Sequence, residues 1–338
     1  MLQNLTKMIS IILSNNKIIS IDKLNRLVNL KMFRANNNLI QNISVISNFI
    51  YLEQLDLSYN QITSIEAISS LKNLTMIYFS YNKIESIESL SNLTMLKQID
   101  LSHNEIISID AISNLNIITR VDFDFNKIKD ISQAFNQKQT KLFMIGLSHN
   151  YLTNVDSLIN TTNLTALLLN HNQLKSINGI KTSNLMILNL ANNLIEDISP
   201  ACNSLRLTQL NMSNNMITKS IRCLENIKNL TMIDLRNNTK IIEFININNM
   251  NNLAKVYINS DQIFDRYKLF FKNTLNNRII KRDKYNVAFI KSLFFITNSI
   301  DCELTFYLIK HFNIHYNLFY EFHIKKFVEK CSDYLLDK

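Results

Sequence analysis

Histidines and carboxylates recur in this 338-residue sequence at spacings that could form a metal site or a catalytic site. His149 and His171 could ligate a metal ion, and Ser148 next to His149 could supply a nucleophile and its base. Asp122 and Asp124 could form an acid–base pair of carboxylates. Each of these chemistries needs its side chains to converge on one point. The first question is therefore which elements carry these residues.

An asparagine returns along the chain, mostly in steps of 22 residues. Around Asn60, apolar side chains lie 8, 5 and 3 residues before it and 2 and 5 residues after it, and the same holds around Asn172. Asparagine is over-used in the whole chain, but composition alone does not produce a phase-locked pattern, so we interpret it as a repeat. The rung asparagines are Asn16, Asn38, Asn60, Asn82, Asn104, Asn126, Asn150, Asn172, Asn193, Asn215 and Asn238, with Asp261 in the twelfth place.

The repeat pattern has a physical explanation. Apolar residues 5 and 3 positions before the asparagine predict a short strand with one buried face, and strands of successive repeats would stack into a parallel sheet. After each strand the chain turns inward, where unpaired backbone N–H and C=O groups are costly. A side-chain amide offers two donors and an acceptor, so a column of asparagines can pair these groups. We therefore expect the rung asparagines to be structural.

The pattern LxxLxLxxNxIxxI resembles the leucine-rich repeat family, in the 22-residue form typical of internalin-type and phosphatase-regulator-type repeats. The resemblance covers about twelve repeats in residues 1–263 and weakens at Lys240 and Asp261, which replace an apolar residue and an asparagine. It implies an α/β-type repeat solenoid. This is a curved coil with a parallel sheet on its concave face and short 3₁₀ or extended segments on its convex face.

Function must then lie in the outward-facing positions that vary between repeats. Aspartates in the strands predict an acidic patch interrupted by Tyr78, and a strip of aromatic and histidine side chains follows the strand ends. Such side chains are frequent where partners dock. The alternative is that the strip consists of common local variants of the repeat, in which each residue simply stacks on its neighbours, and that the aspartates form only a solvated face. The predicted partner-binding residues are Asp56, Tyr59, Tyr78, Tyr81, Asp100, His103, Asp122, Asp124, Phe125, His149 and His171.

The repeat argues against the chemistries considered first. Histidines one or two repeats apart stand in a line and do not converge on one metal ion. Ser148 lacks a glycine-flanked turn and a third partner, and Asp122 and Asp124 lack a predicted pocket. With two glycines, the chain cannot supply a phosphate-cradling loop. We expect no catalytic residues, no metal and no cofactor.

Composition narrows the setting in which we expect the protein to act. The net charge of +9 is spread along the chain and does not favour specific nucleic-acid binding. No apolar run approaches the ~20 residues of a membrane span. The four cysteines form no disulfide framework and suit a reducing compartment. We expect a monomer inside the cell, in the cytoplasm.

The repeat pattern stops near Phe264, and the composition changes. Residues 264–338 are rich in phenylalanine and tyrosine, with apolar residues three and four positions apart, which is typical of amphipathic helices. We expect a small helical bundle that caps the open end of the solenoid. The alternative is an effector module that recruits another protein.

Three functions follow from these observations. The first is a non-catalytic scaffold that binds a protein partner on the concave face. The second is a regulatory adaptor, in which the repeats bind a target and residues 264–338 recruit a ligase or phosphatase. The third is a structural member of an expanded repeat family with no fixed ligand. The composition also resembles the leucine-rich-repeat gene families of insect poxviruses, which would imply a role in an infected host cell; a protozoan or bacterial source is the alternative.

Overall fold

The computed structural model describes residues 6–137, 140–181, 183–238, 241, 250 and 252–257. The chain divides into two compact units, residues 1–255 and residues 256–338, and the first unit is described here. The predicted helical cap or effector module, residues 264–338, lies outside the described residues, as does Asp261.

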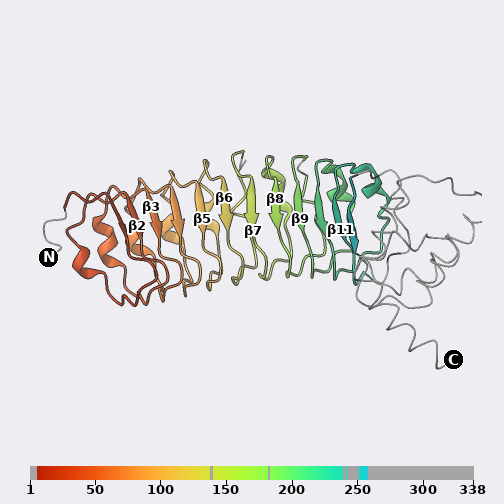
Figure 1. Ribbon diagram of the computed structural model, residues 1–338. Helices are drawn as coiled ribbons and strands as arrows, with labels where there is room; N and C mark the ends of the chain where they lie inside the picture. Colours follow the sequence, from red (N-terminus) through yellow and green to blue (C-terminus); the bar gives the residue numbers. More distant parts are fainter. Residues whose placement is uncertain are drawn as a thin grey trace, which may run out of the picture. The chain divides into compact units, whose positions relative to one another are not determined.

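Each described repeat contributes one three-residue strand to a single sheet (Figure 1). The strands follow one another in chain order from β1 to β12, and every pair from β1 to β11 is parallel. The strands are β1 (Ser10–Ile12), β2 (Met32–Arg34), β3 (Gln54–Asp56), β4 (Met76–Tyr78), β5 (Gln98–Asp100), β6 (Arg120–Asp122), β7 (Met144–Gly146), β8 (Ala166–Leu168), β9 (Ile187–Asn189), β10 (Gln209–Asn211), β11 (Met232–Asp234) and β12 (Lys255–Tyr257).

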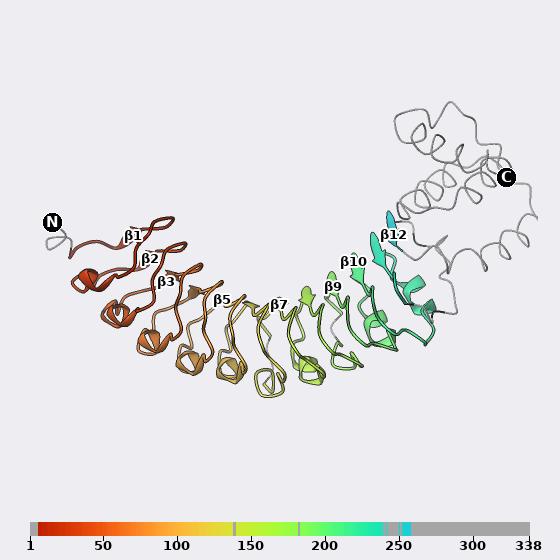
Figure 2. The same ribbon diagram turned by 90° about the horizontal axis from the view of Figure 1, so that it is seen from below.

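Short 3₁₀ helices return the chain from one strand to the next on the opposite side of the coil. Figure 2 shows the strands of this unit on the inner side of a curve and the 3₁₀ helices on its outer side. This arrangement confirms the predicted leucine-rich-repeat solenoid. The helices are η2 (Asp22–Leu24), η3 (Ser44–Asn48), η4 (Glu66–Ile68), η5 (Glu88–Leu90), η6 (Asp110–Ile112), η7 (Asp156–Asn160), η8 (Ser199–Asn203) and η9 (Arg222–Asn226).

The core between the two sides is a column of aliphatic and phenylalanine side chains. In the repeat of Asn60, the apolar residues Leu55, Leu57, Ile62 and Ile65 are at most 1% exposed. The corresponding strand residues of the first repeat are only half-buried, because no earlier repeat covers them. Stacking therefore creates a core that a single repeat cannot form.

The rung asparagines link neighbouring repeats through their side-chain amides. Asn60 donates from Nδ2 to the carbonyl oxygens of Leu57 at 3.0 Å and of Ala35, in the preceding repeat, at 3.0 Å. Its Oδ1 accepts a hydrogen bond from the N–H of Ile40 at 3.0 Å. Corresponding bonds from Oδ1 to the preceding repeat recur from Asn38 to Asn238. The amide column thus satisfies backbone groups that the inward turn would leave unpaired in the core.

One expectation about the cysteines is wrong. Cys202 in η8 and Cys223 in η9 form a disulfide, with their Cα atoms 5.7 Å apart. The two residues are 21 positions apart, so one turn of the solenoid brings them together. Because disulfides persist in oxidising compartments, this pair does not favour the reducing environment that the sequence suggested, and a cytoplasmic location stays a prediction.

Candidate functional site

The residue before each rung asparagine adopts a left-handed backbone conformation, with φ between 53° and 60°. Asparagine tolerates this conformation, whereas a bulky side chain there is unusual and costs about 1 kcal/mol or more. At both ends of the solenoid the position holds asparagine: Asn15, Asn37, Asn192, Asn214 and Asn237. Six consecutive repeats between them carry a ring instead. We call these residues the ring strip: Tyr59, Tyr81, His103, Phe125, His149 and His171.

The rings of the strip form one continuous stack. Successive ring centroids lie 3.9–4.2 Å apart, and neighbouring planes differ by only 10–15°. Beyond the last ring, the side-chain amide of Asn192 lies 3.1 Å from Nε2 of His171. The strip therefore continues from the repeat of Asn60 to that of Asn172 without a gap.

Stacking decides which parts of the rings are available to a partner. Within the stack each ring face is covered by its neighbour, so the accessible parts are the ring edges and their polar tips. Tyr59 is 50% exposed, Tyr81 is 42% exposed and Phe125 is 41% exposed. The strip offers a rigid row of hydroxyl groups, ring nitrogens and apolar edges just beyond the ends of strands β3 to β8.

The aspartates of the acidic patch come from neighbouring strands. Asp56 pairs with Tyr78, Tyr78 with Asp100, Asp100 with Asp122, and Asp122 with Gly146 in the register of the sheet. Tyr78 donates its hydroxyl to Oε1 of Gln98 at 2.9 Å and separates Asp56 from the other aspartates. The structure therefore brings together Asp100, Asp122 and Asp124, which we call the three central aspartates, and leaves Asp56 apart.

Gly146 lets two of these carboxylates lie close to the sheet. A Cβ atom on Gly146 would meet Oδ1 of Asp122 at 2.9 Å and Oδ1 of Asp124 at 3.0 Å. Asp124 also accepts a hydrogen bond from the backbone N–H of Ser148 at 2.6 Å. The two carboxylates thus occupy space that a side chain at position 146 would fill.

Burial and mutual repulsion disfavour the charged forms of these carboxylates. Burial, and next the charge of Asp122, raise the pKa of Asp124 to about 7, although its hydrogen bonds with Ser148 act in the opposite direction. Burial also raises the pKa of Asp122, and the charge of Asp100 adds to this effect. Near neutral pH, Asp124 is therefore present in both its protonated and its charged form.

Two histidines of the ring strip, His103 and His149, are held towards their neutral form. Partial burial lowers the pKa of His103, although the charges of Asp100 and Asp122 act in the opposite direction. Partial burial also lowers the pKa of His149, and the stacked His171 adds to this effect. At pH 7 these two rings carry little positive charge to offset the three central aspartates.

Arg120 is the cation nearest to this group, and it pairs weakly. Its Nη2 lies 3.9 Å from Oδ2 of Asp122, and its side chain is 44% exposed. By contrast, Arg236 holds Asp234 with hydrogen bonds of 3.0 Å and 2.6 Å at the other end of the unit. In the described part of the chain, no lysine or arginine is within ion-pair distance of Asp100 or Asp124.

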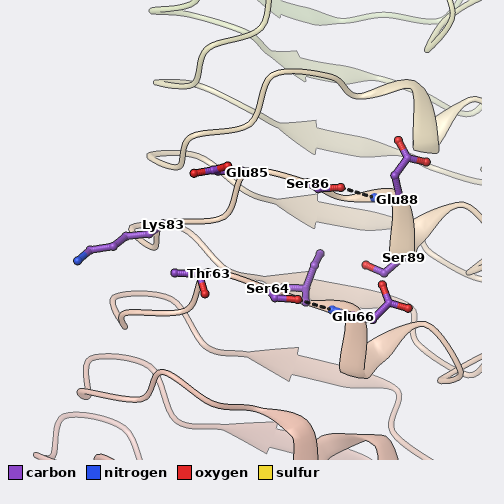
Figure 3. A pocket seen from close by; sticks show the side chains of 9 residues that line it. Thr63, Ser64, Glu66, Lys83, Glu85, Ser86, Glu88 and Ser89 are labelled. Atoms are coloured by element: carbon purple, nitrogen blue, oxygen red, sulfur yellow. Dashed lines mark hydrogen bonds between the residues drawn. The ribbon is translucent and has the colours of Figure 1, made fainter.

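An open pocket of about 370 Å³ lies between two adjacent repeats, along the segments that connect the rungs Asn60 and Asn82 to η4 and η5 (Figure 3). The hydroxyl groups of Ser64 and Ser86 accept hydrogen bonds from the N–H groups of Glu66 and Glu88, and the hydroxyl of Ser89 is buried with no partner. The other residues that line the pocket are Thr63, Ile65, Lys83 and Glu85.

Across the described residues, no cluster of three or more histidine, cysteine or acidic side chains is arranged to hold a metal ion.

Sequence reasoning identified the ring strip and the acidic patch, but it missed three features around them. Neither Gly146 nor Ser148 was linked to the acidic patch, and Arg120 was not considered. Gly146 follows Asp122 at the same position of the next repeat, and this glycine could have indicated that space is left for the carboxylates. Stacking of the strip residues on one another was the sequence-based alternative to a partner surface, whereas their left-handed backbone could not be read from the spacing.

Comparison with known proteins agrees with this fold. Residues 50–106 match the leucine rich repeat family. No curated protein matches the chain. An internalin from Listeria monocytogenes has 24% sequence identity and a TM-score of 0.63, with 76% of this chain and 82% of that chain covered. In the part of the chain that is described, no helix has the length and apolar character needed to cross a membrane.

Two further solved structures are similar to this chain. The functional domain of InlJ from Listeria monocytogenes, which includes a cysteine ladder, has 20% identity and a TM-score of 0.65, with 75% of this chain and 60% of that chain covered. The ectodomain of the receptor kinase GASSHO1/SCHENGEN3 from Arabidopsis thaliana, in complex with CASPARIAN STRIP INTEGRITY FACTOR 2, has 21% identity and a TM-score of 0.58. There the coverage is 74% of this chain and 38% of that chain. At these identities the likeness shows the fold.

Proposed function

Starting from the leucine-rich-repeat fold of this chain, we propose that it is a non-catalytic scaffold that binds a protein partner on its concave strand face. The contact surface in this proposal is the ring strip together with the acidic patch beside it. Leucine-rich-repeat proteins are in general binding scaffolds, and a receptor ectodomain in complex with its partner among the similar structures supports this proposal.

One observation carries the proposal. Six consecutive repeats place a ring in a left-handed backbone conformation that asparagine adopts at the same position in the flanking repeats. The flanking repeats demonstrate that the scaffold needs only asparagine there. Residues held in unfavourable backbone conformations concentrate at functional sites, because selection for binding tolerates the cost.

Exposure of the ring edges supports the same conclusion. Tyrosine and histidine combine an apolar body with a polar tip, and such side chains are frequent in the centres of protein interfaces. A rigid row also loses little conformational entropy when a partner docks, because its side chains are already ordered by stacking.

Photocrosslinking in a cell extract tests this proposal. A photoreactive amino acid replaces Tyr81 in one protein and Tyr51, which is 50% exposed but belongs to the outer segment of its repeat, in a second. We expect a discrete crosslinked protein from position 81 and none from position 51. Crosslinks of equal yield at both positions would contradict a concave binding site.

A variant with two rings removed provides the second arm. Tyr81→Asn and Phe125→Asn together install the residue that the flanking repeats use, so the fold should persist. The matched control is Tyr51→Asn with Ile107→Asn, which removes exposed apolar side chains outside the strand face. The first variant should lose the crosslinked partner captured from a third reporter position on the strand face, Gln98, and the control should retain it. Retention by both would remove the ring strip from the proposed site.

A further inference from the structure

The strand face has a charge opposite to that of the whole chain. The protein carries a net charge of +9. Between β3 and β7, however, the outward positions from the first strand residue to the ring hold four aspartates and a single cationic side chain, Arg120. All of these positions lie within the described residues. A surface whose sign opposes the overall charge selects partners by their charge.

Cations of the described residues offset little of the negative charge of this surface, although the raised pKa values of Asp122 and Asp124 reduce that charge near neutral pH. Arg120 approaches only Asp122, at 3.9 Å, and partial burial lowers the pKa values of His103 and His149. The three central aspartates instead repel one another, since Asp100 and Asp122 are direct neighbours in the sheet. The cost of holding them together falls when an external cation approaches.

The carboxylates occur beside an apolar wall. The three central aspartates lie in the repeats whose strip residues are His103 and Phe125, and the exposed ring edges there can contact the aliphatic stem of a long side chain. Lysine and arginine have such stems and place their charge at the tip. Because the ring faces are covered by stacking, the contact is made with ring edges and carboxylate oxygens.

We propose that the partner segment bound on the strand face between β3 and β7 is basic, and that its lysine or arginine side chains are directed at Asp100, Asp122 and Asp124. This inference rests on the proposed function, because it specifies the chemistry of the partner bound at the same face. Anionic partners such as nucleic acids are repelled there.

Binding of a defined probe to the full chain tests this inference. The probe is a short unstructured peptide of alternating arginine and serine, labelled for fluorescence anisotropy, and its counterpart carries glutamate in place of arginine. We expect the arginine peptide to bind, and its affinity to fall steeply as salt increases. The chain as a whole is positive, so binding of this peptide requires a local acidic surface.

A triple variant locates that surface. At pH 8, where Asp124 is mostly charged, Asp100→Asn, Asp122→Asn and Asp124→Asn remove these charges and keep on each side chain one oxygen that accepts hydrogen bonds, so the variant should fold at least as stably as the wild type. Its affinity for the arginine peptide should fall about tenfold or more. The matched control, Glu66→Gln, Glu88→Gln and Asp110→Asn, removes three carboxylates from the outer 3₁₀ helices η4, η5 and η6. It should stay within about twofold of wild type.

The outcomes separate this inference from the proposed function. Equal binding of both peptides, or equal losses in the triple variant and its control, would overturn the basic partner. If the triple variant still captures the crosslinked cellular partner while the ring variant loses it, the face binds protein but charge does not select that protein. If both variants capture it, the proposed site itself is wrong.

Discussion

The central and the flanking repeats of this solenoid share one backbone but differ in what they place on it. From Asn60 to Asn172 the residue before the rung is a ring, and towards both ends it is asparagine, yet φ is nearly the same in both regions. The rung bonds and the parallel register are also shared. The rung bonds and the strand register thus form a common framework, and the residue before the rung varies without changing that framework. Because the backbone hydrogen bonds are satisfied equally in both regions, we expect that folding does not require the rings.

The two regions also treat their charges differently. In the flank, Asp234 is only 4% exposed and is held by Arg236. In the centre, Asp124 has no cation at ion-pair distance, and its pKa is raised to about 7. A paired carboxylate contributes to stability, whereas an unpaired and partly buried one reduces it. The central repeats are therefore the part of the unit in which an unpaired carboxylate reduces stability, and they are also where we propose that the partner binds.

The largest expected effect concerns the framework itself. Asn104→Ala would leave the N–H of Ile84 and the carbonyls of Phe79 and Leu101 without the amide that pairs them. Since each buried unpaired group costs about 1–3 kcal/mol, we expect a loss of about 3–5 kcal/mol in the free energy of unfolding in urea. At the exposed end rung, Asn16→Ala should cost less than about 1 kcal/mol. Similar losses at both rungs would show that the amide column is not the common framework.

A smaller effect is expected from the covalent link that the flank has and the centre lacks. Replacing Cys202 and Cys223 with serine opens a loop of 21 residues and should lower the free energy of unfolding by about 3 kcal/mol. Adding a reductant should destabilise the wild type by a similar amount and leave the variant unchanged. A wild type that is indifferent to reductant would contradict a stabilising link between η8 and η9.

Charge removal should have opposite signs in the two regions. The pKa of Asp124 is raised from 3.8 to about 7, so the folded chain keeps a proton that the unfolded chain releases between these values. Its destabilising effect is therefore absent at acidic pH and complete above about pH 7. At pH 8, Asp124→Asn should raise the free energy of unfolding by about 2 kcal/mol, an advantage that disappears by pH 4.

The matched change in the flank is Asp234→Asn. It removes the charge of this side chain and one of the two hydrogen bonds with Arg236, and it should lower the free energy of unfolding by about 1–3 kcal/mol at pH 8. Urea unfolding of both variants from pH 4 to pH 8 provides the measurement. If Asp124→Asn were also destabilising at pH 8, the carboxylate would be part of the framework and not of the site.

The smallest effect is expected from exchanging the ring and the asparagine at the position before the rung between the two regions. Phe125→Asn removes two stacking contacts but relieves the left-handed backbone, so these contributions nearly cancel. We expect a change in the free energy of unfolding of less than about 1 kcal/mol. In the flank, Asn192→His should extend the strip with a comparably small change. A loss of several kcal/mol on Phe125→Asn would mean that the rings support the fold after all.

The sequence supported the fold prediction well because the repeat sets its own register. Apolar residues such as Leu55 and Leu57 alternate with outward residues, and the pattern returns every 22 residues with no long-range information needed. The positions of Asp100 and Asp122 on neighbouring strands followed from the same 22-residue spacing. Residue types that vary at a constant position could therefore be assigned to one surface from their spacing alone.

The disulfide is a contact that the repeat spacing did not predict. Cys202 lies nine residues after its rung, Asn193, and Cys223 lies eight residues after Asn215. The two cysteines are thus out of register in the repeat, and sequence spacing alone does not pair them. Only the three-dimensional course of η8 and η9 places their Cα atoms 5.7 Å apart.

By itself, the sequence determined the solenoid, the rung asparagines and the column to which each variable side chain belongs, because these depend on a local period. The tertiary structure determined how the side chains of each column pack and how far they are exposed. It stacked the rings so that their faces are closed, and it placed Asp124 against Gly146, where burial raises its pKa. These properties depend on distances between repeats and on exclusion of water, which arise only when neighbouring turns of the coil pack together.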